Sequence, residues 1–134
     1  ATPALAQSTW QTLRACHTTS PPVDGQAQLR ITTNRSGEKS TQSIQVFAAS
    51  QLDGELNDIK VEIPPYAAIE NLKGNAAKLG NRVSITIAIE DNWKTILKRI
   101  ANGKELIVHA GNERISVPLV GSGNAIASIA DCVG

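Results

Sequence analysis

Apolar and polar residues alternate along several stretches of the chain, which is the pattern expected of strands that bury one face. Two of these stretches flank the polar segment NRSGEKS and predict a β-hairpin. A third ends at Pro64-Pro65, a fourth precedes the segment EDNW, and the last two flank Gly111-Asn112, a pair suited to a two-residue hairpin turn. The apolar positions of these six predicted strands are Leu29 and Ile31; Ile44 and Val46; Ile59, Val61 and Ile63; Val83, Ile85, Ile87 and Ile89; Leu106 and Val108; and Ile115, Val117 and Leu119.

The start of the chain predicts one further strand, where Trp10 and Leu13 lead into Cys16 with threonines nearby. The segment that follows, HTTSPPVDGQ, contains two prolines and the pair Asp24-Gly25, which favour turns over a central strand. We therefore expect a loop over residues 17–26.

Three other stretches have the spacing of helices that bury one face. Residues 67–79 carry apolar positions three and four apart and predict a short helix despite Gly74. The segment WKTILKRIAN predicts an amphipathic helix that Asp91 or Asn92 caps at its start and that Gly103 ends in a left-handed conformation. A small last helix is predicted after the segment VGSG. The apolar positions of these helices are Ile69, Leu72, Ala76 and Leu79; Trp93, Ile96, Leu97 and Ile100; and Ala125, Ile126, Ile129, Ala130 and Val133.

Strands joined by hairpins, with helices inserted mainly late in the chain, predict an α+β fold. A chain of 134 residues can bury roughly two-thirds of the surface that its unfolded form exposes, so it can fold as one domain. We expect a single domain over residues 7–134 that is mainly an antiparallel sheet or a β-sandwich, with two or three short helices and one closing disulfide.

Residues 1–6 and the two cysteines point to export from the cell. The sequence ALAQ at positions 4–7 has the form of a signal-peptidase site, so residues 1–6 are interpreted as a signal-peptide remnant or a disordered tail. Cys16 and Cys132 would pair in an oxidising periplasm, and a bond closing so long a loop is worth about 4–5 kcal/mol. A chance ALA sequence and two buried free thiols in a cytosolic protein are the alternatives.

The formal net charge is +1, from 13 Lys and Arg against 12 Asp and Glu, and it gives no large field of one sign that would attract nucleic acid or anionic lipid. No apolar run approaches the ~20 residues that span a bilayer. We therefore expect no nucleic-acid partner and no membrane span. Lys94, Lys98 and Arg99 share part of one predicted helix, with Lys104 just beyond, and form either a solvated face or a contact for an acidic partner.

The segment VPLVGSGNAIASIADC places two glycines between a predicted strand and a predicted helix, as a dinucleotide-binding fingerprint does. Ile126 stands where that fingerprint requires Gly or Ala. We therefore interpret the glycines as a tight turn, with Ser122 or Asn124 capping the last helix and bringing Cys132 back toward Cys16.

The sequence contains no evident catalytic constellation. Ser122 lacks the Gly-x-Ser-x-Gly elbow of a nucleophile, and His17 and His109 are the two histidines that could serve it as a base. Disulfide formation would exclude Cys16 and Cys132 as nucleophiles, and the four His and Cys residues lack the close spacing of metal ligands. Other polar features are interpreted as a cap, a turn and a chance glycosylation sequon: Glu90-Asp91, Asp53-Gly54-Glu55 and Asn34. We predict no catalytic residue, no metal site and no cofactor.

Three loop residues form the candidate partner-binding site. Ser36 and Lys39 belong to the polar segment RSGEKS, whose tip could reach into a cleft. Tyr66, the only tyrosine, follows Pro64-Pro65 on a stiff loop, where it would either anchor an interface or pack beneath its own loop.

The C-terminal third, WKTILKRIANGKELIVHAGNERISVPLVGSGNAIASIADC, resembles small exported alphaproteobacterial proteins of the invasion-associated locus B family. The shared pattern covers roughly residues 93–132 and consists of a helix, a G-x-x-L-x-V strand, a hairpin partner ending in a P-L-x-G turn, and a final helix. This resemblance implies an exported protein with a role in host interaction or in the envelope.

A second resemblance is to periplasmic inhibitors of host lysozymes, small disulfide-closed β-rich domains that push a polar loop into the acidic cleft of the enzyme. It implies that Lys39 pairs with a catalytic carboxylate while the hydroxyls of Ser36 and Tyr66 hydrogen-bond beside it. We therefore expect a non-enzymatic periplasmic or secreted protein of a Gram-negative bacterium that binds a protein partner, most concretely a host lysozyme. A structural or assembly factor of the cell envelope and a small hydrolase are the alternatives.

Overall fold

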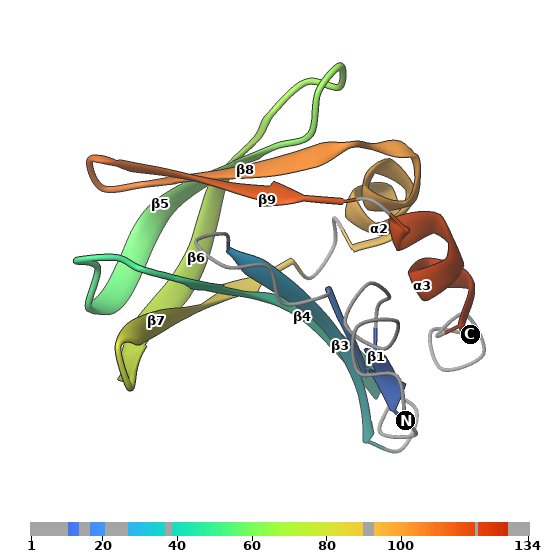
Figure 1. The fold of residues 1–134 in the computed structure, drawn as a ribbon, viewed down its shortest axis with the longest axis horizontal. Helices are drawn as coiled ribbons and strands as arrows, with labels where there is room; N and C mark the ends of the chain where they lie inside the picture. Colours follow the sequence, from blue (N-terminus) through green and yellow to red (C-terminus); the bar gives the residue numbers. More distant parts are fainter. Residues whose placement is uncertain are drawn as a thin grey trace, which may run out of the picture.

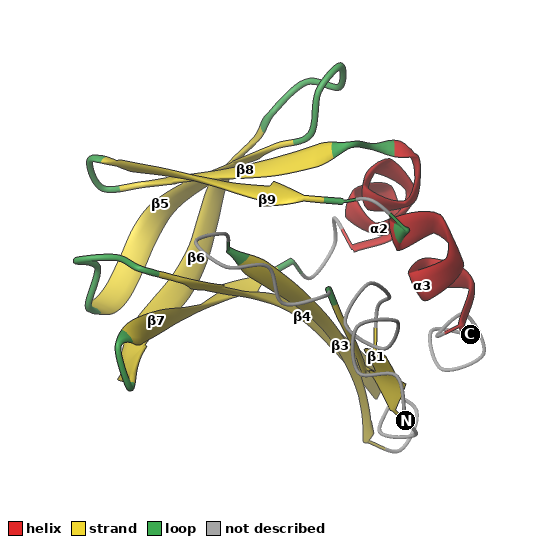
Figure 2. Ribbon diagram, in the orientation of Figure 1, coloured by secondary structure: helices red, strands yellow, loops and turns green. Residues whose placement is uncertain are grey.

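A single antiparallel sheet forms most of the structure (Figures 1 and 2). The computed structural model describes residues 11–13, 17–20, 27–36, 39–89, 93–119 and 121–128. The nine strands of this described part lie in the order β1-β2-β3-β4-β7-β6-β5-β8-β9. Their bounds are β1 Gln11–Leu13, β2 His17–Thr19, β3 Gln28–Ser36, β4 Lys39–Ala48, β5 Gly54–Glu62, β6 Ile69–Leu79, β7 Arg82–Ala88, β8 Glu105–Ala110 and β9 Glu113–Pro118.

The sheet curls into a half-barrel around a hydrophobic core. In Figure 1, β8 and β9 lie above β3, β4 and β7, and β5 and β6 cross between these two layers. The curl also brings β3 and β9 into contact, although they lie far apart in the order of the sheet. The largest fully buried side chains of this core are Leu29, Ile31, Ile44, Ile59, Ile63, Ile85, Ile87, Ile89, Ile96, Ile100, Leu106 and Leu119.

The two predicted hairpins are confirmed. β3 pairs with β4 along its whole length, with Ile31 opposite Ile44, and both of these side chains are fully buried. β8 pairs with β9 across a turn in which Gly111 has a φ of 58°. A positive φ at the first turn residue is what a two-residue hairpin of this twist requires, and glycine adopts it without steric cost.

The helix predicted over residues 67–79 is wrong, because this stretch forms strand β6. Asn71 has a φ of 60°, and the pairing of β6 with β5 is irregular in this region. A bulge shifts the phase of a strand by one residue, which changes the spacing between Ile69 and Leu72 from two to three. Beyond it, the inward positions are Leu72, Gly74 and Ala76, so a glycine stands where the sequence pattern needed an apolar side chain.

The predicted α+β fold class is also wrong, since the structure is mostly antiparallel sheet and forms neither a flat sheet under helices nor a two-sheet sandwich. Of the three predicted helices, two are present in the described part, α2 (Trp93–Asn102) and α3 (Ser122–Ser128). The described residues contain no disulfide, and Cys16 and Cys132 both lie outside them. The proposed remnant over residues 1–6 and the caps at Asp91 and Asn92 lie outside them as well.

Helices α2 and α3 pack against each other and lie together at one end of the half-barrel (Figure 2). Ile96, Leu97 and Ile100 form the buried face of α2, as its spacing predicts. The left-handed exit predicted for Gly103 is wrong, because Gly103 is not among the residues with positive φ. Glycine is needed there for space: a Cβ atom would lie 2.5 Å from Cγ2 of Ile63.

The loop predicted over residues 17–26 begins with a short strand, β2, that pairs with both β1 and β3. Its central residue, Thr18, is fully buried, and Ser20 beyond it donates its backbone N–H to the carbonyl of Leu29 at 2.8 Å. Because the buried position of β2 is polar, the alternation of apolar residues that marks the other strands is missing here.

Candidate functional site

Tyr66 lies on the short connection between β5 and β6, at the top of the view in Figure 1. A turn closes directly after the buried Ile63, where the backbone N–H of Tyr66 donates to the Ile63 carbonyl at 2.9 Å. The Tyr66 side chain is 38% exposed, and within the described residues Leu79 is the other large hydrophobic side chain that is exposed. Tyr66 therefore projects from a turn whose base is anchored in the core.

Arg99 on α2 holds the Tyr66 loop in place. Its Nη1 donates to the carbonyl of Ala67 at 2.8 Å, and its guanidinium carbon lies 5.3 Å from the centroid of the Tyr66 ring. A guanidinium at this distance attracts the face of an aromatic ring, by about 0.5–1 kcal/mol at an exposed site. One side chain thus fixes both the backbone and the ring of the loop, which restricts the freedom of Tyr66 before any partner arrives.

The exposed side of α2 extends this surface with positive charge. Lys94 and Lys98 are exposed, as is Lys104 just beyond the helix, while Arg99 is half-buried. Lys94 Nζ lies 5.6 Å from the centroid of the Trp93 ring. We call Tyr66, Arg99 and Lys98 together the Tyr66 surface, in which Arg99 contacts the aromatic ring and the exposed Lys98 precedes Arg99 on α2.

Ser36 and Lys39 are placed away from the Tyr66 surface. They are the last residue of β3 and the first of β4, and they face each other in the strand register. This hairpin tip lies at the bottom of Figure 1, whereas the loop between β5 and β6 lies at the top. The structure therefore brings two of the three predicted partner-binding residues together and keeps the third at the opposite end.

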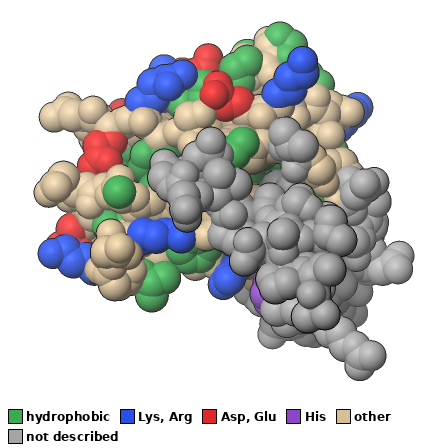
Figure 3. Space-filling model, in the orientation of Figure 1, with side chains coloured by type: hydrophobic (Ala, Val, Ile, Leu, Met, Phe, Trp, Pro, Cys, Tyr) green, Lys and Arg blue, Asp and Glu red, His purple; other side chains and the backbone are tan. Residues whose placement is uncertain are grey.

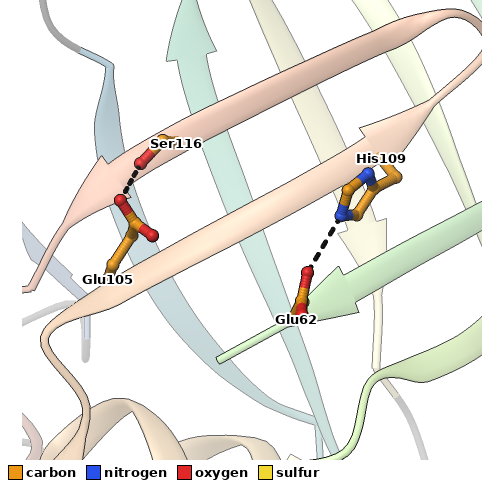
Figure 4. Close-up of polar contacts among 4 residues, drawn as sticks. All are labelled: Glu62, Glu105, His109 and Ser116. Atoms are coloured by element: carbon orange, nitrogen blue, oxygen red, sulfur yellow. Dashed lines mark hydrogen bonds and ion pairs between the residues drawn. The ribbon is translucent and has the colours of Figure 1, made fainter. Parts of the chain in front are cut away.

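The outer face of β5, β8 and β9 carries two polar pairs (Figure 4). Nε2 of His109 lies 3.2 Å from Oε1 of Glu62, and the Ser116 hydroxyl donates to Oε2 of Glu105 at 2.6 Å. Each pair joins side chains on neighbouring strands, and these side chains remain partly exposed. Because Ser116 donates its proton to Glu105 and not to His109, the four residues do not form a hydroxyl–histidine–carboxylate relay.

Ser122 is buried, with 2% of its surface exposed, and its hydroxyl donates to the carbonyl of Ile100 at 2.6 Å. This hydrogen bond joins the start of α3 to the last turn of α2. Carbonyls in the last turn of a helix have no partner within the helix, so Ser122 satisfies one of them. A buried hydroxyl engaged in this way is not presented to a substrate.

A further cluster, which the sequence analysis did not predict, consists of Arg30, Phe47 and Arg82 on the outer face of the sheet. The guanidinium carbons of Arg30 and Arg82 lie 5.2 Å and 5.6 Å from the centroid of the Phe47 ring. We call these three residues the Phe47 cluster. Phe47, the only phenylalanine, follows the buried Val46, so it falls in phase with the polar positions of its strand, and that phase is the signal from which it could have been found.

Within the described residues, no group of three or more His, Cys, Asp or Glu side chains could hold a metal ion. Asp53-Gly54-Glu55 lies where the chain enters β5, and Gly54 has a φ of 74°, as a turn there requires. Glu90 and Asp91 lie outside the described part of the chain. His17 belongs to β2, and its Nδ1 is buried without a hydrogen-bond partner.

Comparison of the chain with protein-family models, with curated proteins and with solved structures found no match. The resemblances to invasion-associated locus B proteins and to lysozyme inhibitors therefore stay predictions. Neither α2 nor α3, the helices of the described part, has the length and apolar character needed to cross a membrane.

Proposed function

We propose that this protein is a non-enzymatic binding protein that docks onto a protein partner through the Tyr66 surface. The observation that carries the proposal is that the exposed ring of Tyr66 is held in one place by Arg99. Tyrosine and arginine are over-represented among the residues that dominate binding energy, and a side chain that is already ordered loses less entropy on binding.

The charge of the Tyr66 surface favours an acidic partner. Lys98 lies beside Arg99 on α2, and among the described residues the structure contains one ion pair, His109–Glu62, which involves neither of them. A cleft with paired carboxylates, as in enzymes that cleave glycosidic bonds, would accept both cations and the tyrosine hydroxyl. Inhibition of a host lysozyme is accordingly the most concrete form of the proposal, and the predicted location of the protein is the periplasm or the extracellular space.

The proposal is tested by titrating the full chain into c-type, g-type and i-type lysozymes while cell-wall lysis is followed. We expect inhibition of at least one class, and Tyr66→Ala should weaken it by tenfold or more. Leu79→Ala is the matched control, because Leu79 is the other exposed large hydrophobic side chain of the described residues and lies at the end of β6. Arg99→Lys keeps the positive charge but loses the planar guanidinium group, so its effect on inhibition should lie between those of Tyr66→Ala and Leu79→Ala.

Equal effects of Tyr66→Ala and Leu79→Ala on inhibition would refute the Tyr66 surface as the interface. Lack of inhibition in all three lysozyme classes at micromolar excess would remove the lysozyme form. Co-purification of the chain with an envelope complex that survives Tyr66→Ala would instead support the alternative of an assembly factor and contradict our proposal.

A further inference from the structure

The acidic residues of the strands are confined to one part of the sheet, whereas basic residues occur throughout it. β1, β2, β3, β4 and β7, which lie side by side, contain no Asp or Glu. In the face shown in Figure 3, the acidic side chains lie towards the top and left, where β5, β8 and β9 are found in Figure 1. The Asp and Glu residues of the strands are Glu55, Asp58, Glu62, Glu70, Glu105 and Glu113, all of them on β5, β6, β8 and β9.

The Phe47 cluster lies on the outer face of the part of the sheet that has no acids. Ile31, Val46 and Ile85 point into the core from β3, β4 and β7, so the alternation places Arg30, Phe47 and Arg82 on the opposite face. The two arginines come from the strands on either side of β4, and Phe47 between them is 8% exposed. The Phe47 ring is therefore largely covered. The guanidinium groups of Arg30 and Arg82, which lie over it, are the groups that this face presents to a partner.

Both guanidinium groups are held by neutral partners. Nε of Arg30 donates to Oγ1 of Thr19 at 3.0 Å, while Arg82 donates to Oε1 of Gln28 at 2.9 Å and to the carbonyl of Phe47 at 3.2 Å. A guanidinium carries five N–H donors, and the hydrogen bonds among the described residues use one on Arg30 and two on Arg82. Within the described residues, the single ion pair is His109–Glu62, so neither arginine has a carboxylate partner there.

We propose that the Phe47 cluster is a second docking surface, which receives an acidic segment of a protein partner with one carboxylate on each guanidinium. The separation of the two guanidinium carbons cannot exceed the sum of their distances from the ring centroid. Carboxylates on alternate residues of an extended segment, about 7 Å apart at the backbone, fall within that limit. Arginine binds carboxylates through two parallel hydrogen bonds, which suits fixed guanidinium groups of this kind.

The surroundings favour a protein segment over a polyanion or a membrane. The neighbouring outward positions on β3, β4 and β7 are uncharged hydrogen-bonding residues, among them Thr32, Gln45 and Ser84. Two cations neutralise few phosphates, whereas nucleic acids and anionic membranes are bound by several Lys and Arg acting together. A sheet face with two fixed cations and many uncharged donors matches a short peptide that carries a pair of acids.

The probe for this surface is a fluorescein-labelled peptide of alternating Ser and Glu, titrated with the full chain at low salt and followed by fluorescence anisotropy. We expect binding that weakens as salt is added and that falls at least tenfold in the Arg30→Gln/Arg82→Gln double variant. Arg114→Gln is the control, because Arg114 is an exposed arginine on β9, a strand outside the acid-free region. Circular dichroism and urea unfolding establish that each variant is folded.

Equal loss of peptide binding in the double variant and in Arg114→Gln would overturn the proposal, because it would show only a general effect of charge. Tighter binding of inorganic phosphate or of phosphatidylserine vesicles than of the peptide, dependent on Arg82, would overturn the assignment of a protein segment. Self-association that the double variant abolishes would identify a second copy of the chain as the occupant and would also contradict it. Tyr66→Ala should leave peptide binding unchanged, which separates this test from that of the Tyr66 surface.

Discussion

Replacement of Gly74 by alanine tests how closely β6 and β7 approach each other in the sheet. A Cβ atom at this position would lie 2.3 Å from the backbone oxygen of Thr86 on β7 and 2.8 Å from Cδ1 of Ile59 on β5. Ile59 can adjust its side chain, but the Thr86 carbonyl belongs to the backbone of the neighbouring strand and cannot move without disturbing the sheet. Overpacking costs about 1–3 kcal/mol, and alanine recovers roughly 0.5–1 kcal/mol through the lower entropy of its unfolded chain. Because the clash is with backbone, we take the upper end of the overpacking cost and expect Gly74→Ala to lower the free energy of unfolding by about 2 kcal/mol.

The assay is urea unfolding followed by circular dichroism, in which the midpoint and the slope give the free energy of unfolding. Gly80→Ala is the control: Gly80 has a φ of 66° and nothing within 4 Å of an added Cβ, so it reports backbone strain of about 1 kcal/mol without a clash. A Gly74→Ala variant as stable as the wild type, or more stable than Gly80→Ala, would refute the close approach of β6 and β7 at this point.

Three further changes test other contacts, each by the same unfolding measurement. Ser122→Ala removes the buried hydrogen bond to the Ile100 carbonyl and should cost about 1 kcal/mol; no change in stability would mean that the bond does not join the two helices. A double-mutant cycle on Glu62 and His109 should give a coupling energy below about 1 kcal/mol because both side chains are partly exposed, and a larger value would contradict the picture of a surface pair. Phe47→Ala should cost about 2 kcal/mol because the ring is nearly buried beneath two arginines, and a neutral result would show that these arginines do not cover it.

The strands that the sequence predicts correctly are those whose inward positions are all apolar and evenly spaced. In β7, Val83, Ile85 and Ile87 are buried in strict alternation, and the pattern needs no knowledge of the neighbouring strands. β6 escapes this reasoning for two local reasons, a glycine at an inward position and a shifted phase near Asn71. Gly74 is there because β7 passes too close for a side chain, and that is a property of the assembled sheet that no local pattern contains.

The candidate surfaces likewise combine features that the local sequence indicates with features that depend on the assembled fold. The exposure of Tyr66 follows from its neighbourhood, because the turn at Pro64-Pro65 keeps the chain outside the sheet. The contact between Tyr66 and Arg99 does not follow from the local sequence, because it depends on α2 packing beside the connection between β5 and β6. The Phe47 cluster is still less accessible to sequence reasoning, because Arg82 reaches Phe47 only when β7, and not β5, pairs with β4.

That strand order also explains how a nearly neutral chain obtains a local charge. β5 follows β4 in sequence and carries acids, so if it paired with β4 it would bring Glu55 and Asp58 towards the outer face beside Phe47. The chain instead crosses from β4 to the far side of β6 and returns along β7, which has Arg82 and no acid. With a net charge of +1, the protein exerts little attraction at long range, so the proposed binding of an acidic segment would depend on fixed guanidinium groups at contact distance. The curl of the sheet encloses the core on one face, and the strand order keeps the two arginines of the other face apart from the carboxylates of the described strands.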